Sequence, residues 1–382
     1  MKLPYIIKGS LILGGILLGL IGTRYAKSAA PVIITPIKPL TIVQPDIKKQ
    51  GGNPYGTIMA IDIKNAPNTR TERIALYVPK HHNSNQTILR PGILTHQKNA
   101  TATIIICHGF MTCKEDVQFL RQLFTPGKYN FLSFDFRAHG EQAHGQRCTF
   151  GRDEACEVLT AVHFLKHHPP TKNKPVILYA FSMGAVASIE AQAKDPSLFA
   201  AMVLDCPFDS SESIIKRGLD NVKFHFFGYR FNIPARDVIQ KYAFHPYVQS
   251  MLKAFLKSMA YVDIRNIDIR LYPVNTAQVI HKVRIPCFFI HCKYDEKVSV
   301  DSVKLLYEKT GASYKKLWLT NGRGHYDSFF YNPEEYIKRV REFVDKAANG
   351  KLEKITKQEV LEDKPDWRQC KGYVWGIGKS QS

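Results

Sequence analysis

The chain has 382 residues, of which 45% are hydrophobic and 11% aromatic, so it can bury a large core and is neither mainly disordered nor a membrane protein with many spans. Its formal net charge of +20 raises the affinity for anionic surfaces, although a basic surface that only keeps the protein soluble is the simpler interpretation. No zinc-finger, RNP or helix-turn-helix motif accompanies the charge, so we expect no nucleic-acid partner.

Residues 1–29 predict a membrane-targeting segment. A basic start precedes an apolar run from Leu11 to Ile21, and small residues follow, which is the order typical of a secretory signal peptide. A membrane anchor is the alternative, because Leu3 to Gly22 reaches the length of about 20 residues that spans a bilayer. Arg24, directly after the run, favours the anchor slightly. We expect a membrane-anchored protein, or an exported one if the segment is cleaved.

The first part of the folded domain follows a linker. Residues 30–55 are rich in Pro, Ile and Lys without a clear period, which predicts an extended linker. Thr57–Ile63 and Arg73–Val78 then predict two strands of a hairpin. The polar residues 81–99 predict a loop.

From residue 102 onward, predicted strands and helices alternate. The strands are continuous apolar runs rich in β-branched residues, as expected for strands buried on both faces, whereas the helices show a period of 3.6. We expect strands at 102–107, 131–136, 175–181, 201–206, 285–291 and 314–319, and helices at 153–168, 183–194, 300–309 and 333–347. This alternation predicts an α/β fold whose mostly parallel sheet carries helices on both faces.

The alternation breaks between Pro207 and Lys282, in a stretch rich in basic and aromatic residues. An insertion at this point of a βα array should fold over the carboxyl ends of the strands as a cap. A packed subdomain without substrate contact is the alternative. Residues 349–382 form a charged tail with Trp367 and Trp375, and the sequence leaves its packing open.

The strongest functional signal is the segment Tyr179–Gly184, which reads YAFSMG. It follows a predicted buried strand and opens a helix, so Ser182 stands on a sharp turn that exposes its hydroxyl above the sheet. Small residues are needed two positions before and after the serine. Gly184 meets this need, and Ala180 stands where the usual pattern has Gly.

A serine hydroxyl needs a base, and the base needs an anionic partner that fixes its tautomer. His325 follows the last predicted parallel strand, between Gly324 and Tyr326. Asp295 follows the strand at 285–291 and is the expected partner. The order serine, acid, histidine is the chain order of such a site. Glu296 is the main rival for the acid, and Asp205 and Asp327 are weaker ones.

The oxyanion formed during attack needs two donors. One is expected from the backbone N–H of Met183, at the start of the helix, where the helix dipole also helps. The other is expected from the N–H of Phe110 in the loop after the first parallel strand, where Gly109 permits a tight turn.

These motifs resemble those of the α/β-hydrolase superfamily, most closely its bacterial esterase and serine-aminopeptidase-like branch. The resemblance covers residues 102–347 and implies an α/β-hydrolase domain over 56–348, with a cap insertion at about 207–282. The string DFRAHG resembles the structural loop after the second parallel strand of the family. The motifs that carry the resemblance are HGF at His108, DFRAHGE at Asp135, AFSMG at Ala180, LDCPF at Leu204, IPCFFIHCKYDEKV at Ile285 and GRGHYDSF at Gly322.

The expected activity is hydrolysis of a carboxylic ester or thioester through an acyl-enzyme, without a metal or an organic cofactor. The partner is then a small acyl substrate, which would suit a lipid if the chain is held at a membrane surface. A peptidase is one alternative, for which Asp263 and Asp268 are thin candidates to hold a substrate amine. A non-catalytic binding protein on the same scaffold and a polyanion binder are the others.

Overall fold

The computed structural model describes residues 69–81, 84–143, 145–221, 223–226, 229–232, 236–250, 268–353 and 355–364. These residues belong to one compact unit of the chain. The predicted targeting segment 1–29, the linker 30–55 and the strand expected at Thr57–Ile63 lie outside them. Among the helices of the described residues, none has the length and apolar character needed to cross a bilayer.

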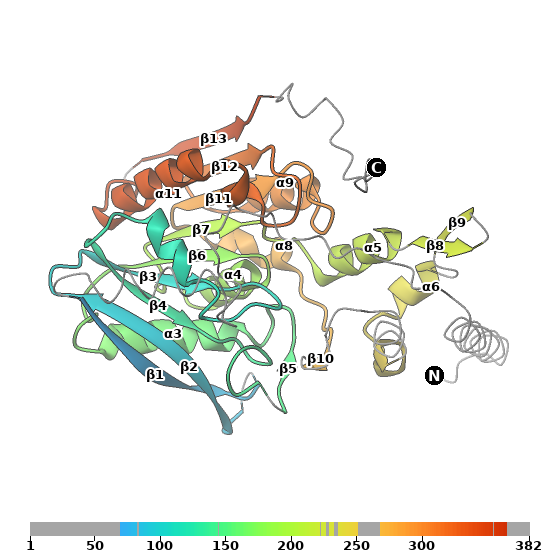
Figure 1. Cartoon of the computed structure of the whole chain (residues 1–382), viewed down its shortest axis with the longest axis horizontal. Coiled ribbons are helices and arrows are strands. Elements are labelled where there is room, and N and C mark those ends of the chain that lie inside the picture. The colour runs from blue at the N-terminus through green and yellow to red at the C-terminus, as the bar shows by residue number, and fades with distance from the viewer. Residues whose placement is uncertain are drawn as a thin grey trace, which may run out of the picture. The chain divides into compact units, whose positions relative to one another are not determined.

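A nine-stranded sheet forms the centre of the described unit (Figure 1). Its order is β1-β2-β4-β3-β6-β7-β11-β12-β13. The strands from β4 to β13 run parallel to one another, and β1 and β2 are antiparallel to their neighbours. The strands are β1 Thr69–Pro79, β2 Thr87–Gln97, β3 Ala102–Cys107, β4 Tyr129–Phe134, β6 Val176–Phe181, β7 Ala201–Asp205, β11 Cys287–Cys292, β12 Tyr314–Thr320 and β13 Lys357–Glu362.

Helices cover both faces of this sheet. Successive residues of a strand point to opposite faces, so the apolar residues of each strand contribute to two separate clusters. Ile105 and Cys107 of β3 pack in the apolar cluster shared with α3 Ala155–His167, α4 Met183–Lys194 and α9 Val300–Lys309. Ile104 and Ile106 pack in the cluster shared with η1 Gln118–Leu123 and α11 Pro333–Ala348. The sheet therefore has a core on each face, as the apolar runs predict.

Two strands of the central sheet lie where the sequence predicts none. β2 occupies most of residues 81–99, expected as a loop, and pairs with β1 along its whole length. The sequence does not predict this strand because the charged Arg90 interrupts its apolar pattern. In the structure Arg90 is fully buried, and its guanidinium donates to the carbonyls of Phe136 and Gln142. β13 lies beyond residue 348, the expected end of the domain, and pairs in parallel with β12.

The insertion between β7 and β11 starts and ends on the core. Phe208 and Val274, near its two ends, pack with Val186 of α4 and Val298. Between them lie α5 Ser211–Asn221, β8 Lys223–Phe226, β9 Tyr229–Asn232, α6 Arg236–Lys241 and β10 Asp268–Ile269, followed by α8 Thr276–Val279 and η3 Ile280–Lys282. β10 pairs with β5 Arg147–Cys148, so the insertion also contacts the loop region that precedes α3.

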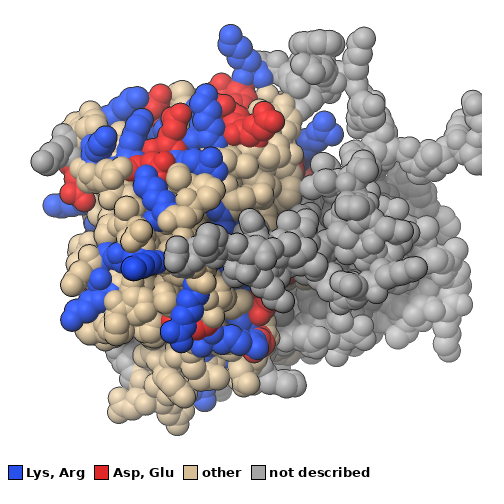
Figure 2. Space-filling model, turned by 60° about the vertical axis from the view of Figure 1, so that its left-hand side comes forward, with Lys and Arg blue, Asp and Glu red and all other residues tan. Residues whose placement is uncertain are grey.

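Charged side chains of both signs share the surface of the described residues. Figure 2 shows Lys and Arg dispersed among Asp and Glu on one face, without one continuous basic area. Exposed and half-exposed charges also pair, as Arg339 does with Glu335 at 2.7 Å. On the face shown, the positive charge is thus not gathered as a binding surface for a polyanion would require.

Candidate active site

Ser182 stands at the sharp turn between β6, which ends at Phe181, and α4, which begins at Met183. Its backbone has φ 51° and ψ −124°, a left-handed conformation that L-residues adopt only when the surroundings enforce it. Gly184 is required here because a Cβ at this position would lie 2.4 Å from the backbone oxygen of His108. The fully buried Ala180 shows that one methyl is accommodated on the other side of the turn.

His325 reaches Ser182 from the loop after β12. Its Nε2 lies 2.8 Å from Ser182 Oγ, and its Nδ1 lies 2.7 Å from Asp295 Oδ2. Because a carboxylate can only accept, Nδ1 carries the proton and donates it to Asp295. In the neutral imidazole Nε2 is then the acceptor for the serine hydroxyl. The structure thus brings together the three residues that the sequence singles out, from three separate strand ends.

The loop after β11 holds Asp295 as a buried, fully bonded carboxylate. The residue is 2% exposed, and its Oδ1 accepts the backbone N–H groups of Lys297 and Val298 at 2.8 and 3.0 Å. Burial alone raises the pKa of Asp295, but the hydrogen bond and charge of His325, followed by the other contacts, outweigh it and hold the pKa below its ordinary value. The carboxyl is therefore an anion at neutral pH.

The rival acids occupy other positions. Glu296 is exposed. Asp327 accepts the backbone N–H of Arg323 at 2.8 Å. Asp205 is buried at the end of β7 and accepts a hydrogen bond from Tyr336 at 2.6 Å. The carboxylate that contacts the imidazole of His325 at hydrogen-bond distance is that of Asp295.

The two expected oxyanion donors lie at the ends of neighbouring strands. Met183 is the first residue of α4, so its N–H has no acceptor within the helix. Phe110 lies two residues beyond His108 at the end of β3, and a Cβ on Gly109 would lie 2.7 Å from the Phe181 ring. The loop therefore packs directly against the strand that delivers Ser182.

His108 fixes the loop that carries Phe110, a role that the sequence did not reveal. Its Nε2 accepts the backbone N–H of Phe136 at 3.0 Å, so the neutral ring carries its proton on Nδ1, which lies 2.8 Å from the carbonyl oxygen of Gly109. Burial first, then the nearby His139, lowers the pKa of His108 to about 3. The ring is therefore neutral throughout the physiological range and keeps one fixed tautomer.

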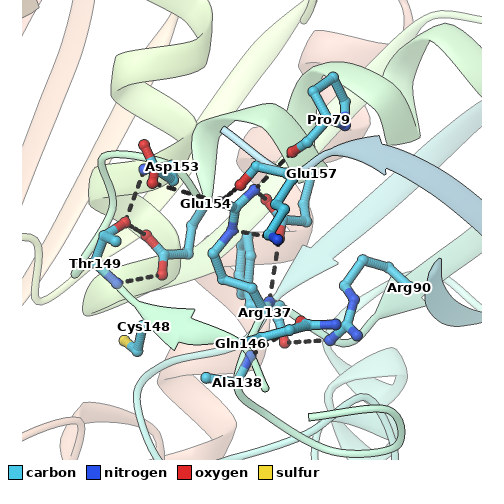
Figure 3. A network of polar contacts seen from close by, with 12 residues as sticks. Pro79, Arg90, Arg137, Ala138, Gln146, Cys148, Thr149, Asp153, Glu154 and Glu157 are labelled. Atoms are coloured by element: carbon cyan, nitrogen blue, oxygen red, sulfur yellow. Dashed lines mark hydrogen bonds and ion pairs between the residues drawn. The ribbon is translucent and has the colours of Figure 1, made fainter. Parts of the chain in front are cut away.

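The loop after β4, which carries the DFRAHG string, is held by buried ion pairs. Figure 3 shows Arg137 between Glu157 and the carbonyl oxygen of Pro79. Arg137 donates to both carboxylate oxygens of Glu157, at 2.8 and 2.9 Å. Asp135 accepts from the backbone and the ammonium of Lys114, at 2.8 and 2.9 Å. These contacts fix the loop against which His108 and Phe110 pack, which agrees with a structural role for the string.

Cys113, Glu115 and Asp135 offer ligand atoms close enough to hold a metal ion. The ammonium of Lys114, however, lies 2.8 Å from Glu115 and 2.9 Å from Asp135. An ammonium group already bridges both carboxylates, so this trio has the character of a charge cluster rather than of a metal site.

A second residue that the sequence did not reveal connects the insertion to the acid loop. Arg217 of α5 donates through Nη2 to the carbonyl oxygen of Asp295 and through Nε to that of Glu296, both at 2.8 Å. The planar guanidinium suits two such parallel bonds. A cavity of about 250 Å³ lies beside this contact, lined by Ser213, Ile214, Lys216, Arg217, Asp220, Lys297, Val298, Ser299 and Ser302.

Comparisons with known proteins agree with this fold. The model of the alpha/beta hydrolase family matches residues 104–339. The uncharacterized protein YqkD of Bacillus subtilis (strain 168) is 29% identical over 248 residues, which are 64% of this chain and 71% of YqkD. The match to the family model confirms the predicted α/β-hydrolase fold.

Two solved structures share this fold at low sequence identity. The Pyrococcus furiosus esterase Pf2001 is 21% identical, with a TM-score of 0.54 and coverage of 77% of this chain and 96% of Pf2001. The 2,6-dihydroxy-pseudo-oxynicotine hydrolase is 15% identical, with a TM-score of 0.55 and coverage of 79% and 75%. At such identities the likeness concerns the fold alone.

Proposed function

The chain belongs to the alpha/beta hydrolase family, and on that premise we propose that it is a serine hydrolase that cleaves a carboxylic ester or thioester. The observation that supports this is the unbroken hydrogen-bond relay from Ser182 Oγ through His325 to Asp295, at 2.8 and 2.7 Å. Such a relay turns an ordinary hydroxyl into a nucleophile.

The first half of the proposed reaction acylates Ser182. Its Oγ forms a bond to the carbonyl carbon of the substrate, while its proton passes to Nε2 of His325. The N–H groups of Met183 and Phe110 stabilise the resulting oxyanion. The bond to the leaving alcohol or thiol then breaks, and His325 returns the proton to that group.

The second half releases the acid. His325 takes a proton from a water molecule, whose oxygen bonds to the acyl carbon. The bond to Ser182 Oγ then breaks, and the proton on His325 passes to that oxygen. In both halves Asp295, an anion at neutral pH, stabilises the imidazolium that forms.

A panel of substrates distinguishes this proposal from its alternatives. The full chain is assayed with p-nitrophenyl esters of increasing acyl length, with acyl thioesters and with aminoacyl p-nitroanilides. Turnover of esters or thioesters alone supports the proposal, and a preference for long acyl chains identifies a lipid substrate. Turnover of the anilides alone would instead identify a peptidase.

A fluorophosphonate probe tests the nucleophile directly. We expect it to label Ser182, and we expect Ser182→Ala to lose both labelling and about a million-fold in kcat. Ser188→Ala is the matched control, because Ser188 lies on the same helix and its hydroxyl donates to the carbonyl of Gly184 at 2.7 Å. Absence of labelling, together with absence of turnover on every substrate, would identify a non-catalytic binding protein.

We also propose that residues 1–29 target the protein to a membrane, as an anchor or as a cleaved export signal, an inference that rests on their basic start and apolar run. Carbonate extraction of cell membranes and N-terminal sequencing of the mature protein test it. An intact N-terminus in the membrane fraction identifies an anchor, and a new N-terminus near residue 30 identifies a cleaved signal. An intact chain washed off by carbonate would contradict both.

A further inference from the structure

A chain of hydroxyl groups lies next to the proposed catalytic residues and is not used by the mechanism above. Tyr336 OH donates to Asp205 Oδ2 at 2.6 Å. Tyr179 OH lies 2.8 Å from Tyr336 OH and 3.1 Å from Tyr326 OH. Asp205, Tyr179 and Tyr336 are fully buried. This chain of hydroxyl groups ends at Tyr326, the residue after His325.

Asp205 sets the direction of every hydrogen bond in this chain. Each tyrosine has one proton to donate, and Tyr336 gives its proton to the carboxylate. The oxygen of Tyr336 therefore accepts from Tyr179, and the oxygen of Tyr179 accepts from Tyr326. Among the described residues, Oδ1 of Asp205 has no hydrogen-bond partner, so the carboxylate acts on the chain through Oδ2 alone.

The four members come from four different parts of the fold. Asp205 ends β7, Tyr179 lies on β6, Tyr336 lies on α11, and Tyr326 lies in the loop after β12. The chain thus ties the loop of His325 to two central strands and to a helix. Hydrogen-bonded networks rigidify a structure when their members are satisfied, and here all three tyrosine hydroxyls are hydrogen-bonded while Oδ1 of Asp205 alone among the four residues is without a partner in the described part of the chain.

Tyr326 is the point at which the loop needs such support. Its backbone has φ 61°, a left-handed conformation that is unfavourable for a residue with a bulky side chain. Its ring stacks on that of Phe181, with centroids 4.0 Å apart, and Phe181 directly precedes Ser182. The face of the Tyr326 ring therefore contacts Phe181, and its hydroxyl contacts Tyr179. Both partners lie on β6, the strand that ends directly before Ser182.

We propose that Asp205, Tyr336, Tyr179 and Tyr326 form a positioning chain that holds His325 at the distance from Ser182 at which the proton is transferred. This inference rests on the proposed function. None of the four contacts the reacting atoms, so they act through the loop and not on the substrate. Misplacement of a catalytic group by about 1 Å costs roughly a hundredfold in rate, which gives such a chain a measurable effect.

The charge of Asp205 supports this role. Burial raises its pKa to about 7, against the opposing effect of the Tyr336 hydroxyl and with a further contribution from the charge of Asp295. At pH 8 the carboxylate is ionised and accepts a strong, charge-assisted hydrogen bond. Variants of the positioning chain are therefore assayed at pH 8.

The experiment compares kcat and KM of the full-length protein for p-nitrophenyl butyrate in variants that remove one hydroxyl each. We expect Tyr336→Phe and Tyr326→Phe to lower kcat about tenfold or more and to leave KM within twofold. Tyr129→Phe is the matched control. The buried hydroxyl of Tyr129 also donates to a carboxylate, that of Asp345, but it is not part of the positioning chain. A purely structural role would affect all three variants in stability and none in kcat.

Two further readouts make the test decisive. Asp205→Asn keeps an acceptor for Tyr336, so it should retain more kcat than Asp205→Ala. The downfield proton resonance of the His325 Nδ1–H, hydrogen-bonded to Asp295, should shift or broaden in Tyr336→Phe and Tyr326→Phe and stay unchanged in Tyr129→Phe.

The outcomes separate this inference from the proposed function. Unchanged kcat and an unchanged resonance in Tyr336→Phe and Tyr326→Phe would overturn the positioning chain while leaving the hydrolase intact. A wild-type protein without turnover or probe labelling would overturn the proposed function, and the resonance alone would then decide whether the chain positions His325. Tyr326→Phe, at the half-buried end, serves if Tyr336→Phe does not fold.

Discussion

Replacement of Asp205 by Asn should change how the stability of the protein depends on pH. Burial raises the pKa of this carboxyl from 3.8 to about 7, and the side chain is fully buried. Between about pH 4 and pH 7 the unfolded chain has released this proton while the folded chain retains it. The contribution of this group to the free energy of unfolding therefore falls as the pH rises through this window, and is constant on either side.

The magnitude follows from the size of the shift. About three pKa units at about 1.4 kcal/mol each amount to about 4 kcal/mol of stability that the wild type loses between pH 4 and pH 8 through this one group. Asn does not titrate. The difference in the free energy of unfolding, Asp205→Asn minus wild type, should therefore rise by up to about 4 kcal/mol over that range.

Urea titrations at a series of pH values, followed by the fluorescence of the buried Trp318, measure this difference. Asp345→Asn is the control with the opposite sign. Burial raises the pKa of Asp345, but its hydrogen bonds with Tyr129, Lys128 and Thr125 outweigh burial and leave the pKa lowered, so this variant should lose stability relative to wild type as the pH rises. Parallel pH curves for wild type and Asp205→Asn would refute the reasoning.

Three further predictions concern the site. Asp295→Asn should lower kcat about 10⁴-fold with little change in KM, because the amide favours the wrong tautomer of the histidine; steady-state kinetics checks this, and a loss under tenfold contradicts it. Arg217→Ala should lower kcat about tenfold because the acid loop loses two hydrogen bonds, whereas Lys216→Ala on the same helix should not; equal kinetics of the two variants would remove the role of Arg217. Gly184→Ala should lower the free energy of unfolding by about 1–3 kcal/mol, since its Cβ would lie 2.4 Å from a backbone oxygen; an unchanged urea midpoint contradicts this.

Much of the central fold could be predicted because its signals are local. The β-branched run at 102–107 and the helical periods at 183–194 and 300–309 coincide with β3, α4 and α9. β2 escaped prediction because it contains the buried Arg90 and Pro91, and Pro91 cannot donate to the sheet. β13 escaped because its residues are mostly exposed, so its apolar pattern is weak and pairing with β12 alone defines it.

For the candidate site, too, some features could be predicted from the sequence and others could not. Ser182, Asp295 and His325 could be singled out from the chain because each follows a recognisable strand, and the carboxyl ends of parallel strands meet at one edge of a sheet. How Arg217 holds the acid loop and how Asp205 reaches Tyr326 are decided only by the tertiary structure. Tyr179 and Tyr326 lie 147 positions apart in the chain, and at such separations no local period or propensity encodes a contact; only the packing of the completed sheet and helices creates it.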